Sequence, residues 1–430
     1  MEIGELKIGI LADTHVGRNI PRVVGDLRRE AYRHAFSKAM DILIDENVDY
    51  VIHAGDLFEK RSMTPNDSMY VKNELHRLID SIKANSGKEV QILVVRGNHD
   101  GTLDNSSLDY VEHPLAKYLK VIGDETLRGR REIFDDGAIS AVAVGYTPYI
   151  ASRFKEIKQT VEDSLSKASN EPFLILHTFI SGYHELPPGV SKHNVLPIQE
   201  LEGLSAKVVI CGHHHKRKPP TMLYGKTFIT PGATEAIDLA DEGEYGVFIL
   251  EKNSYKFIPI DPLHEIRNVE VSSGGANKPL EWYRSEAERQ LNSYVANIAV
   301  SNKELIIRLV VKGKSDEDPF RLDANLNELA MEAKKKQPRI LHIQVENKVE
   351  SVSQTLNVPL GGQEEFLLEA MKPLGSLVED IPALMEDVEM ALEEKGSGTT
   401  GLLKPSDRQS FIEKWVKMLE AAVESEQTQS

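Results

Sequence analysis

The stretch Leu6-Lys-Ile-Gly-Ile-Leu-Ala-Asp-Thr-His15 decides the fold, because a nearly unbroken apolar run ends directly in a carboxylate and an imidazole. Strands that are apolar on both sides belong to sheets covered on both faces, which is the arrangement of α/β proteins. We therefore predict a buried strand over residues 6–11, with polar residues at its carboxyl end.

Similar apolar runs recur along the first 260 residues and alternate with helical patterns. Further strands are predicted at 50–54, 90–95, 139–145, 173–176 and 207–211, and helices at 28–46 and 68–84. Three later strands, at 226–230, 245–250 and 254–260, follow one another without helices. We expect these three strands to form a second sheet of more antiparallel character.

Polar side chains follow five of these runs, at or near the point where each strand ends. They are Asp13 and His15, Asp56, Asn98 with His99 and Asp100, His177, and the run His213-His214-His215. Carboxylates, an amide oxygen and imidazoles together suit two divalent cations bound side by side, and two such cations imply hydrolysis of a phosphate ester. Mixed imidazole and carboxylate ligation favours manganese, iron or zinc over magnesium.

Local geometry suggests which of these ligands face the same cation. Side chains alternate along an extended backbone, so Asp13 and His15 are expected to face one cation, and His213 and His215 likewise, with His214 on the opposite side. Asp56 has two oxygens and can bridge cations that lie roughly 3.5–4 Å apart. The formal charge is then +4 from the cations and −2 from Asp13 and Asp56, which leaves about +2 to attract a phosphodiester.

His99 has a different predicted role from the ligands. It follows Asn98 directly, so on an ordinary loop both side chains would not reach the same cation. A positioned imidazole can protonate a departing oxygen, and we assign His99 as the general acid, oriented by Asp100. His53 lies inside a predicted strand, and we expect it to support the site rather than to ligate.

These segments resemble the signature of calcineurin-like metallophosphoesterases over roughly the first 260 residues. The resemblance implies a two-sheet α/β sandwich flanked by helices. It also implies that one metal is held by Asp13, His15, Asp56 and His215, and the other by Asp56, Asn98, His177 and His213.

Four segments resemble more closely the archaeal double-strand-break repair nucleases of the meiotic-recombination-eleven family. They are Leu11-Ala-Asp-Thr-His-Val-Gly17, His53-Ala-Gly-Asp-Leu-Phe58, Arg96-Gly-Asn-His-Asp100, and Pro231-Gly-Ala-Thr-Glu235 with Gly243-Glu-Tyr-Gly-Val-Phe248. This resemblance implies a homodimer with manganese-dependent exonuclease and endonuclease activity on DNA, and a coiled-coil ABC-type ATPase as partner. Family members often carry a histidine where this chain has Glu59, and an arginine–proline–serine segment where it has Arg61-Ser-Met-Thr-Pro65.

The same family suggests how the rest of the chain is organised. We expect a metallophosphoesterase domain over 1–262, a small α+β capping domain over 263–350, a Pro- and Gly-containing linker over 351–375, and a helix–loop–helix over 376–430. Apolar stripes on the two terminal helices would be covered by the ATPase. Packing back on the chain's own core remains the alternative.

Composition gives a few further expectations. The net charge is −16, and residues 361–430 contribute −9 of it (six basic against fifteen acidic residues), so DNA contacts would need a local basic patch. We expect that patch at Lys60, Arg61, Lys216, Arg217 and Lys218. A single cysteine, no long apolar run and no secretory signal indicate a cytoplasmic protein without a membrane span. The resemblance to repair nucleases implies that it is nucleoid-associated.

Two other functions remain open from the sequence. A phosphodiesterase for small or cyclic nucleotides would use the same metals. A non-catalytic scaffold that bridges DNA ends would not need a complete set of ligands, and the set is complete.

Overall fold

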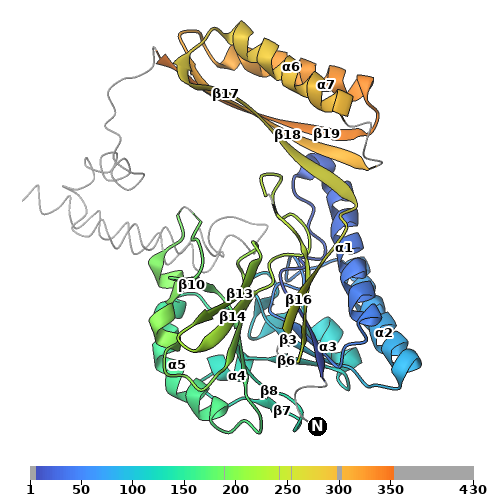
Figure 1. Ribbon diagram of the computed structural model, residues 1–430, viewed down its shortest axis with the longest axis vertical. Helices are drawn as coiled ribbons and strands as arrows, with labels where there is room; N and C mark the ends of the chain where they lie inside the picture. The colour runs from blue at the N-terminus through green and yellow to red at the C-terminus, as the bar shows by residue number, and fades with distance from the viewer. Residues whose placement is uncertain (1–5, 188, 242, 253, 298–302, 353–430) are drawn as a thin grey trace, which may run out of the picture. The chain divides into compact units, whose positions relative to one another are not determined.

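The computed structural model describes residues 6–352, except for 188, 242, 253 and 298–302. Two six-stranded sheets form its larger part (Figure 1). The predicted linker over 351–375 and helix–loop–helix over 376–430 lie almost entirely outside the described residues, and both stay predictions.

The first sheet contains the buried strand that was predicted over residues 6–11. Its order is β16-β15-β1-β2-β3-β6. The strands are β1 (Lys7–Leu11), β2 (Tyr50–His53), β3 (Gln91–Val95), β6 (Leu119–Ile122), β15 (Gly246–Glu251) and β16 (Ser254–Pro259). Strands β1, β2, β3 and β6 are parallel, whereas β15 and β16 extend the sheet in antiparallel fashion beside β1.

The second sheet has the order β13-β14-β12-β9-β8-β7. Its strands are β7 (Phe134–Asp135), β8 (Ser140–Val144), β9 (Phe173–His177), β12 (Val208–Gly212), β13 (Lys218–Leu223) and β14 (Lys226–Thr230). The four central strands are parallel, and only the two edge strands are antiparallel. The expectation that the last three predicted strands form an antiparallel second sheet was therefore wrong, because β14 pairs in parallel with β12 and the other two strands join the first sheet.

Apolar side chains on the facing sides of the two sheets form the central core, with Ile10, Ile52, Ile175, Ile210 and Phe248 among them. Helices α1 (Gly25–Asp45), α2 (Pro65–Ser86) and α3 (Asp109–Leu115) cover the outer face of the first sheet. Helix α5 (Ile150–Leu165) covers the outer face of the second. The domain is thus a sandwich of two sheets between layers of helices, as predicted, and both faces of β1 are buried.

Local sequence explains where the long helices lie. Thr64 caps α2 by accepting a hydrogen bond from the amide of Asp67, Pro65 stands in its first turn, and Gly87 ends it with a left-handed φ of 73°. Helix α1 packs closely on β1, since a side-chain carbon at Gly9 would lie 2.1 Å from Leu43. The absence of a side chain at Gly9 on β1 allows this approach.

Shorter elements complete this part of the chain. They are η2 (Arg22–Val24), β4 (Gly101–Thr102), β5 (Asn105–Ser106), α4 (Asp124–Leu127), β10 (Phe179–Ser181), η3 (Lys192–Asn194), β11 (Val195–Pro197) and η4 (Ile198–Leu201).

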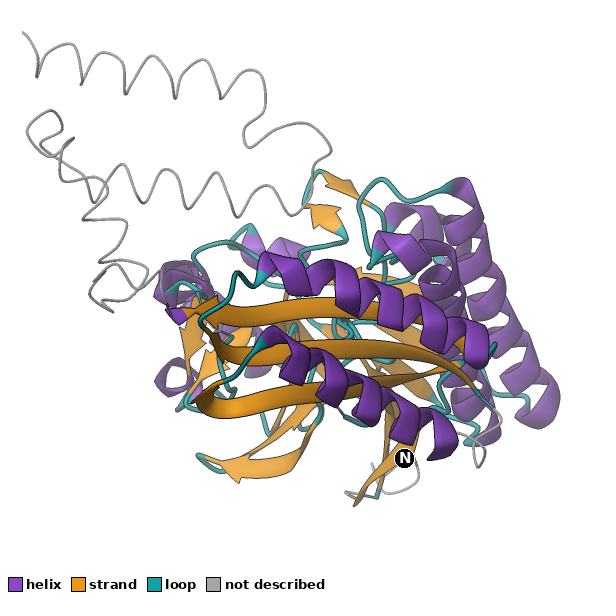
Figure 2. Cartoon of the chain, turned by 90° about the horizontal axis from the view of Figure 1, so that it is seen from above, coloured by secondary structure: helices purple, strands orange, loops and turns teal. Residues whose placement is uncertain are grey.

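A third sheet begins at His264 and shares no strand with the other two among the described residues. It consists of β17 (His264–Asn277), β18 (Glu304–Ser315) and β19 (Ile340–Ser351), all parallel. Helices α6 (Leu280–Asn297) and α7 (Phe320–Lys336) connect these strands and pack on one face of the sheet through their own apolar core (Figure 2). Strands and helices alternate here and the sheet is parallel, so this part is an α/β unit and not the α+β unit that the sequence suggested.

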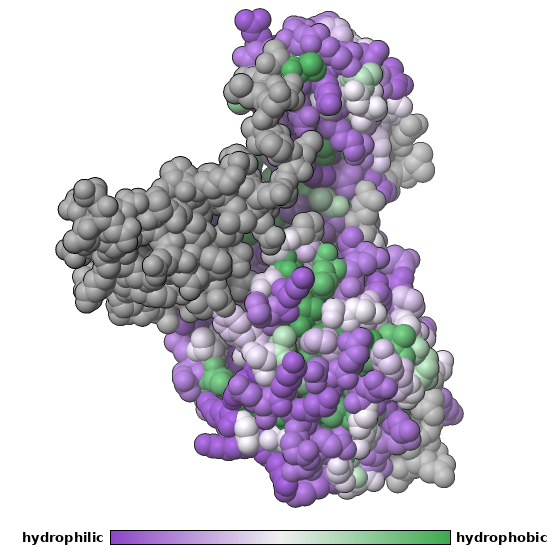
Figure 3. All heavy atoms as spheres, turned by 90° about the vertical axis from the view of Figure 1, so that its left-hand side faces the viewer, coloured by the Kyte–Doolittle hydropathy of each residue, from purple (hydrophilic) through white to green (hydrophobic). Residues whose placement is uncertain are grey.

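The surface fits a protein with many charged residues. Hydrophilic side chains cover most of the described surface on the face drawn in Figure 3, with small hydrophobic patches between them. Among the helices that the structure describes, none is both long enough and apolar enough to cross a bilayer.

Candidate metal centre

The polar residues singled out in the sequence come together at one edge of the sandwich. Asp13 and His15 follow β1, Asp56 follows β2, and Asn98 and His99 follow β3, while His177 ends β9 and His213 and His215 follow β12. The carboxyl ends of parallel strands meet at the same edge of a sheet, so each loop delivers its polar side chain to the same place.

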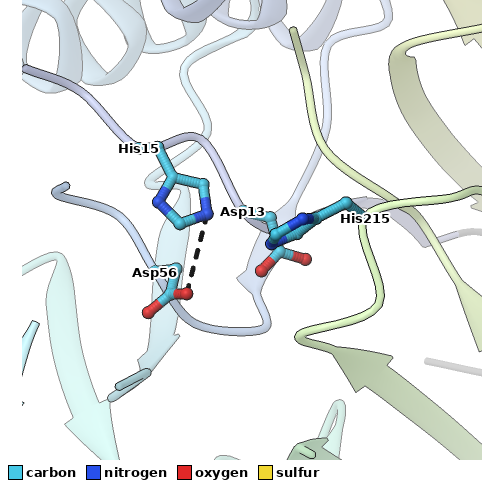
Figure 4. A group of neighbouring side chains, drawn as sticks. All are labelled: Asp13, His15, Asp56 and His215. Carbon is cyan, nitrogen blue, oxygen red and sulfur yellow. Dashed lines mark ion pairs between the residues drawn. The ribbon is translucent and has the colours of Figure 1, made fainter. Parts of the chain in front are cut away.

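Four side chains from three of these loops form one group. Asp13, His15, Asp56 and His215 each offer a ligand atom, and these atoms lie within 4.8 Å of one another (Figure 4). Nε2 of His15 is 3.6 Å from Oδ2 of Asp56. Asp13, His15 and Asp56 are fully or almost fully buried.

A second group shares Asp56 with the first. Asp56, His177 and His213 also offer atoms within 4.8 Å of one another. Nε2 of His177 lies 3.3 Å from Oδ2 of Asp56 and 3.2 Å from Oδ1 of Asn98. Because Nδ1 of His177 is 2.7 Å from the carbonyl of Ala54, that nitrogen donates its proton there and leaves Nε2 free to face the two oxygens.

The two histidines of the His-His-His run fall into different groups, His215 into the first and His213 into the second. The expectation from strand alternation that both face one cation was therefore wrong. Asp13 and His15 do share a group, but they lie beyond the end of β1 with φ of 51° and 42°, so strand alternation is not the cause. Asp56 and His213 have similar left-handed values, and strain of this kind clusters at functional sites.

Two glycines make the close packing of the site possible. Gly55 has a φ of 100°, and a Cβ there would lie 2.1 Å from Nδ1 of His177. A Cβ at Gly97 would lie 2.0 Å from Oδ1 of Asp56. Any larger residue at either position would displace the shared carboxylate or the imidazole that faces it.

The chemistry of these groups fits divalent cations. Several buried polar atoms here have no hydrogen-bond partner, including Oδ2 of Asp56, Nε2 of His15 and Nδ1 of His213. Buried polar atoms without partners are costly, and a cation in each group would satisfy them. The donor set of carboxylates, imidazoles and an amide oxygen is one that first-row divalent metals accept.

The protonation states of the histidines in the metal-free site also favour cation binding. Burial lowers the pKa of His15 and His215 and lowers the pKa of His213 to about 3, so these rings are neutral and keep a lone pair for a cation. Burial also disfavours a proton on His177, but the adjacent Asp56 carboxylate outweighs it and raises the pKa of His177 to about 9. A cation would have to displace that proton, so binding is expected to strengthen as the pH rises.

His99 stands beside the ligands without belonging to either shared group. Its main-chain N–H donates to Oδ1 of Asp56 at 2.9 Å, and its Nδ1 lies 2.8 Å from the carbonyl oxygen of Glu59. With Nδ1 held in this way, Nε2 is the nitrogen available for chemistry. The side chain is 23% exposed, so a substrate can reach it.

Asp100 has a different task from the one expected, which was to orient His99. Its carboxylate accepts hydrogen bonds from the backbone amides of Asp56, Phe58 and Gly97 at 2.9, 3.0 and 2.9 Å, and a longer one from Leu57. The ring of His99 takes its orientation from Glu59 instead. Asp100 therefore fixes the loop that carries Asp56.

Replacing Asp100 by alanine is expected to lower the free energy of unfolding by about 3 kcal/mol or more, because at least three buried N–H groups lose their acceptor. Urea denaturation of the metal-free protein measures this change, and Asp100→Asn should cost less because it keeps one acceptor oxygen. A loss below about 1 kcal/mol for the alanine variant would contradict this role for Asp100.

The other histidines near the site face away from the cation groups. Nε2 of His53 bonds to the hydroxyl of Thr14 at 3.0 Å, as fits a supporting residue. His214 stacks on His184 with ring centres 4.5 Å apart, and its Nδ1 lies 2.8 Å from the carbonyl of Lys216. His53 and His214 therefore support the loops around the site.

The expected DNA-contacting residues have unequal surroundings. Lys60, Arg61 and Lys216 are exposed. Arg217 pairs with Glu244 at 2.7 Å and lies over the ring of Phe257, and the ammonium of Lys218 lies over the ring of Tyr183. Arg217 and Lys218 are therefore engaged within the chain, which the sequence pattern could not reveal.

Comparison with known proteins places this geometry in a family. The family described as calcineurin-like phosphoesterase matches residues 6–217, the span that holds both groups. The chain contains a calcineurin-like phosphoesterase domain. Its two-sheet sandwich and ligand groups support a phosphoesterase that depends on divalent metal.

Curated relatives share a weaker similarity that extends further along the chain. The DNA double-strand break repair protein Mre11 of Methanosarcina acetivorans is 23% identical over 323 residues, covering 73% of this chain and 46% of the relative. The protein of the same name from Methanosarcina mazei is 23% identical over 296 residues, covering 67% of this chain and 43% of the relative. The chain spans less than half the length of these two relatives.

Among solved structures, a dimetal phosphatase from Danio rerio is similar to part of this chain. The similarity covers 57% of this chain and 91% of the phosphatase, with 14% identity and a TM-score of 0.33.

Proposed function

We propose that this protein is a manganese-dependent nuclease that hydrolyses phosphodiester bonds of DNA, as both exonuclease and endonuclease, in the repair of double-strand breaks. The observation that carries the proposal is the pair of ligand groups that share Asp56 at the strand ends of a calcineurin-like phosphoesterase domain. The similarity to two Mre11 proteins, which are named for DNA double-strand break repair, supports DNA as the substrate.

In this proposal each group holds one cation. Asp13, His15, Asp56 and His215 hold the first, and Asp56, Asn98, His177 and His213 hold the second. When bound, two such cations would activate a water as the nucleophile and stabilise charge on the phosphate. The residues of the chain fix the spacing, because Asp56 is anchored through Oδ1 to the amide of His99 and presents Oδ2 to both groups.

His99 supplies the proton for the departing oxygen. Its Nδ1 donates to the carbonyl of Glu59, which fixes the ring plane and leaves Nε2 to carry the second proton of the imidazolium. Burial lowers the pKa of His99, but the carboxylates of Asp56 and Glu59 more than compensate, and the pKa is raised above its usual value of 6.5 in the metal-free site. The residue is thus kept ready to donate a proton.

The contact with DNA is proposed to involve Lys60, Arg61 and the run 216–218. Lys216 is exposed and directly follows the proposed ligand His215. Its ammonium is therefore proposed to contact a phosphate of DNA bound beside the metal centre. Among the described residues no ion pair within the chain engages Lys216, unlike Arg217.

Replacing Lys216 by glutamate is expected to weaken duplex binding and to reduce the slope of log K against log salt by about 1, as the loss of one phosphate contact would. Fluorescence anisotropy over a salt series measures the slope. Lys155→Glu, on the exposed side of α5, is the matched control and should leave the slope unchanged. Equal slopes for the wild type and the Lys216 variant would argue against this contact.

Two alternative functions use the same site. A phosphodiesterase for small or cyclic nucleotides would share the two cations, and a scaffold that only bridges DNA ends would share the DNA contact. The orphaned ligand atoms argue against a scaffold, because a site with no catalytic task would not retain them at a cost in stability.

The test of the proposed function compares substrates. Linear duplex DNA, single-stranded DNA, a cyclic nucleotide and a phosphate monoester are incubated with the protein and Mn²⁺, with Mg²⁺ and with EDTA. Cleavage of DNA that requires Mn²⁺ and is absent with EDTA supports the proposal. Turnover of the cyclic nucleotide alone would favour the small-molecule phosphodiesterase, and binding of DNA without cleavage would favour the scaffold.

The remaining parts of the proposal rest on the relatives and on the sequence. We propose a homodimer that acts with a coiled-coil ABC-type ATPase bound through residues 376–430, in the cytoplasm close to the nucleoid. Domain limits at 262, 350 and 375 belong to the same proposal. The start of the third sheet at His264 is compatible with the first of these limits.

A further inference from the structure

Glu59 is a buried acid that the proposed ligand sets and reaction do not use. It lies three residues after Asp56 and is 5% exposed. Oε2 of its side chain is 3.1 Å from Nδ1 of His15, and both of its carboxylate oxygens accept hydrogen bonds from Nη1 of Arg18, at 2.9 and 3.0 Å. Its carbonyl oxygen faces Nδ1 of His99 at 2.8 Å.

The side chain of Glu59 faces the ring of His15. The contact lies within ion-pairing distance, although it is off the line of a straight hydrogen bond. A carboxylate at this distance favours the neutral tautomer that carries its proton on Nδ1. Nε2, on the side of Asp56, then keeps its lone pair for a cation.

Arg18 holds the carboxylate in this position. Its Nη1 donates to Glu59, and its Nε donates to the carbonyl of Ile237 at 3.0 Å. The loop after β14 is thereby connected through Arg18 and Glu59 to His15. A carboxylate fixed by an arginine in this way has little freedom to leave the imidazole.

Glu59 acts on two imidazoles by different routes. Its carboxylate contacts His15 at 3.1 Å, whereas His99 is held by the main-chain carbonyl at 2.8 Å and lies 3.8 Å from the carboxylate. A substitution of the side chain therefore removes the contact with His15 and the longer one with His99, but spares the carbonyl that orients His99. Manganese binding reports the contact with His15, because His99 belongs to neither proposed ligand set.

A further cation site formed by the same atoms is disfavoured. Ligand atoms of His15, Glu59 and His99 lie within 4.8 Å of one another and could in principle surround a further cation. The guanidinium of Arg18 already occupies the carboxylate, and the carbonyl of Glu59 occupies Nδ1 of His99. A cation there would stand beside a fixed positive charge.

We propose that Glu59 is a positioning residue, whose carboxylate orients His15 and strengthens it as a ligand of one of the two cations. This inference rests on the proposed two-cation site. It assigns a task to the position at which this chain departs from the histidine expected by resemblance.

Manganese binding to the full chain tests the proposal. Calorimetry and electron paramagnetic resonance are used to follow two binding steps in the wild type. In Glu59→Gln one step is expected to weaken by about 10- to 100-fold while the other is unchanged, because His15 belongs to one ligand set only. Glu235→Gln is the matched control, since it neutralises another buried glutamate that pairs with an arginine, Arg28, and should leave both steps unchanged.

A second measurement uses the wild type alone, so it does not depend on the variant folding. Long-range ¹H–¹⁵N correlation of the metal-free protein labelled at histidine reports the tautomer of His15, assigned with His15→Gln. The proton is expected on Nδ1. A proton on Nε2, or two unchanged binding steps in Glu59→Gln, would overturn the positioning role.

Two further outcomes distinguish a failure of this inference from a failure of the proposed metal centre. Three binding steps in the wild type and two in Glu59→Gln would make Glu59 a ligand, which overturns the inference. Failure of the wild type to bind two cations would refute the proposed metal centre itself.

Discussion

His99→Leu is expected to reduce kcat for DNA cleavage by about 10²- to 10⁴-fold while both manganese-binding steps persist. In the proposed reaction the side chain supplies the proton for the departing oxygen, but the main-chain amide of residue 99, which anchors Oδ1 of Asp56, remains in the variant. The proposed ligands therefore keep their positions. Steady-state kinetics with linear DNA and calorimetry with Mn²⁺ measure the two quantities on the same preparation.

The leaving group provides the control for His99. A p-nitrophenyl diester has a leaving group that departs readily without a proton, so the variant should lose much less activity on this substrate than on DNA. Equal losses on both substrates would assign His99 to charge stabilisation or structure instead. Unchanged turnover of DNA would remove His99 from the reaction.

Asp56→Asn is expected to weaken both cation-binding steps and to reduce kcat by roughly 10³-fold or more. The side chain is the only one common to both groups among the described residues, with Oδ2 3.6 Å from Nε2 of His15 and 3.3 Å from Nε2 of His177. Cations contribute several kcal/mol of stabilisation to the transition state, and each ~1.4 kcal/mol corresponds to a factor of ten in rate.

The stability of the metal-free variant should also fall. Burial raises the pKa of Asp56, but the neighbouring His177 and His99 outweigh it and hold the pKa well below its usual value, so the ionised carboxylate stabilises the metal-free fold near neutral pH. An amide at this position loses these attractions, and the metal-free Asp56→Asn protein should melt at a lower temperature than the wild type. A variant that still shows two tight manganese-binding steps would contradict the bridging role of Asp56.

Much of the fold could be predicted from local pattern. Helical spacing of apolar residues placed the predicted helices at 28–46 and 68–84, and the structure has α1 at Gly25–Asp45 and α2 at Pro65–Ser86. Helix α5 was not predicted, although Ile150, Phe154, Ile157, Val161 and Leu165 form its buried stripe at helical spacing. The pattern was present in the sequence and could have identified this helix.

Sheet membership could not be predicted in the same way. Strands β15 and β16 join the first sheet beside β1, more than 230 residues away in sequence. A strand carries no local signal for its partner, because the same alternation of side chains fits any neighbour that buries them. Tertiary packing, and not local sequence, therefore decides that β15 and β16 form the antiparallel edge of the first sheet.

The candidate site, too, was predicted in part from local sequence and decided in part by the tertiary structure. The sequence by itself determined the inventory of Asp13, His15, Asp56, Asn98, His99, His177, His213 and His215, because residue type and position after an apolar run are local properties. The division of His213 and His215 between two groups, and the contacts of Asp100 and Glu59, were decided by the tertiary structure alone. The physical reason is that left-handed backbone conformations and close packing at strand ends set the direction of each side chain, and both depend on residues from distant strands.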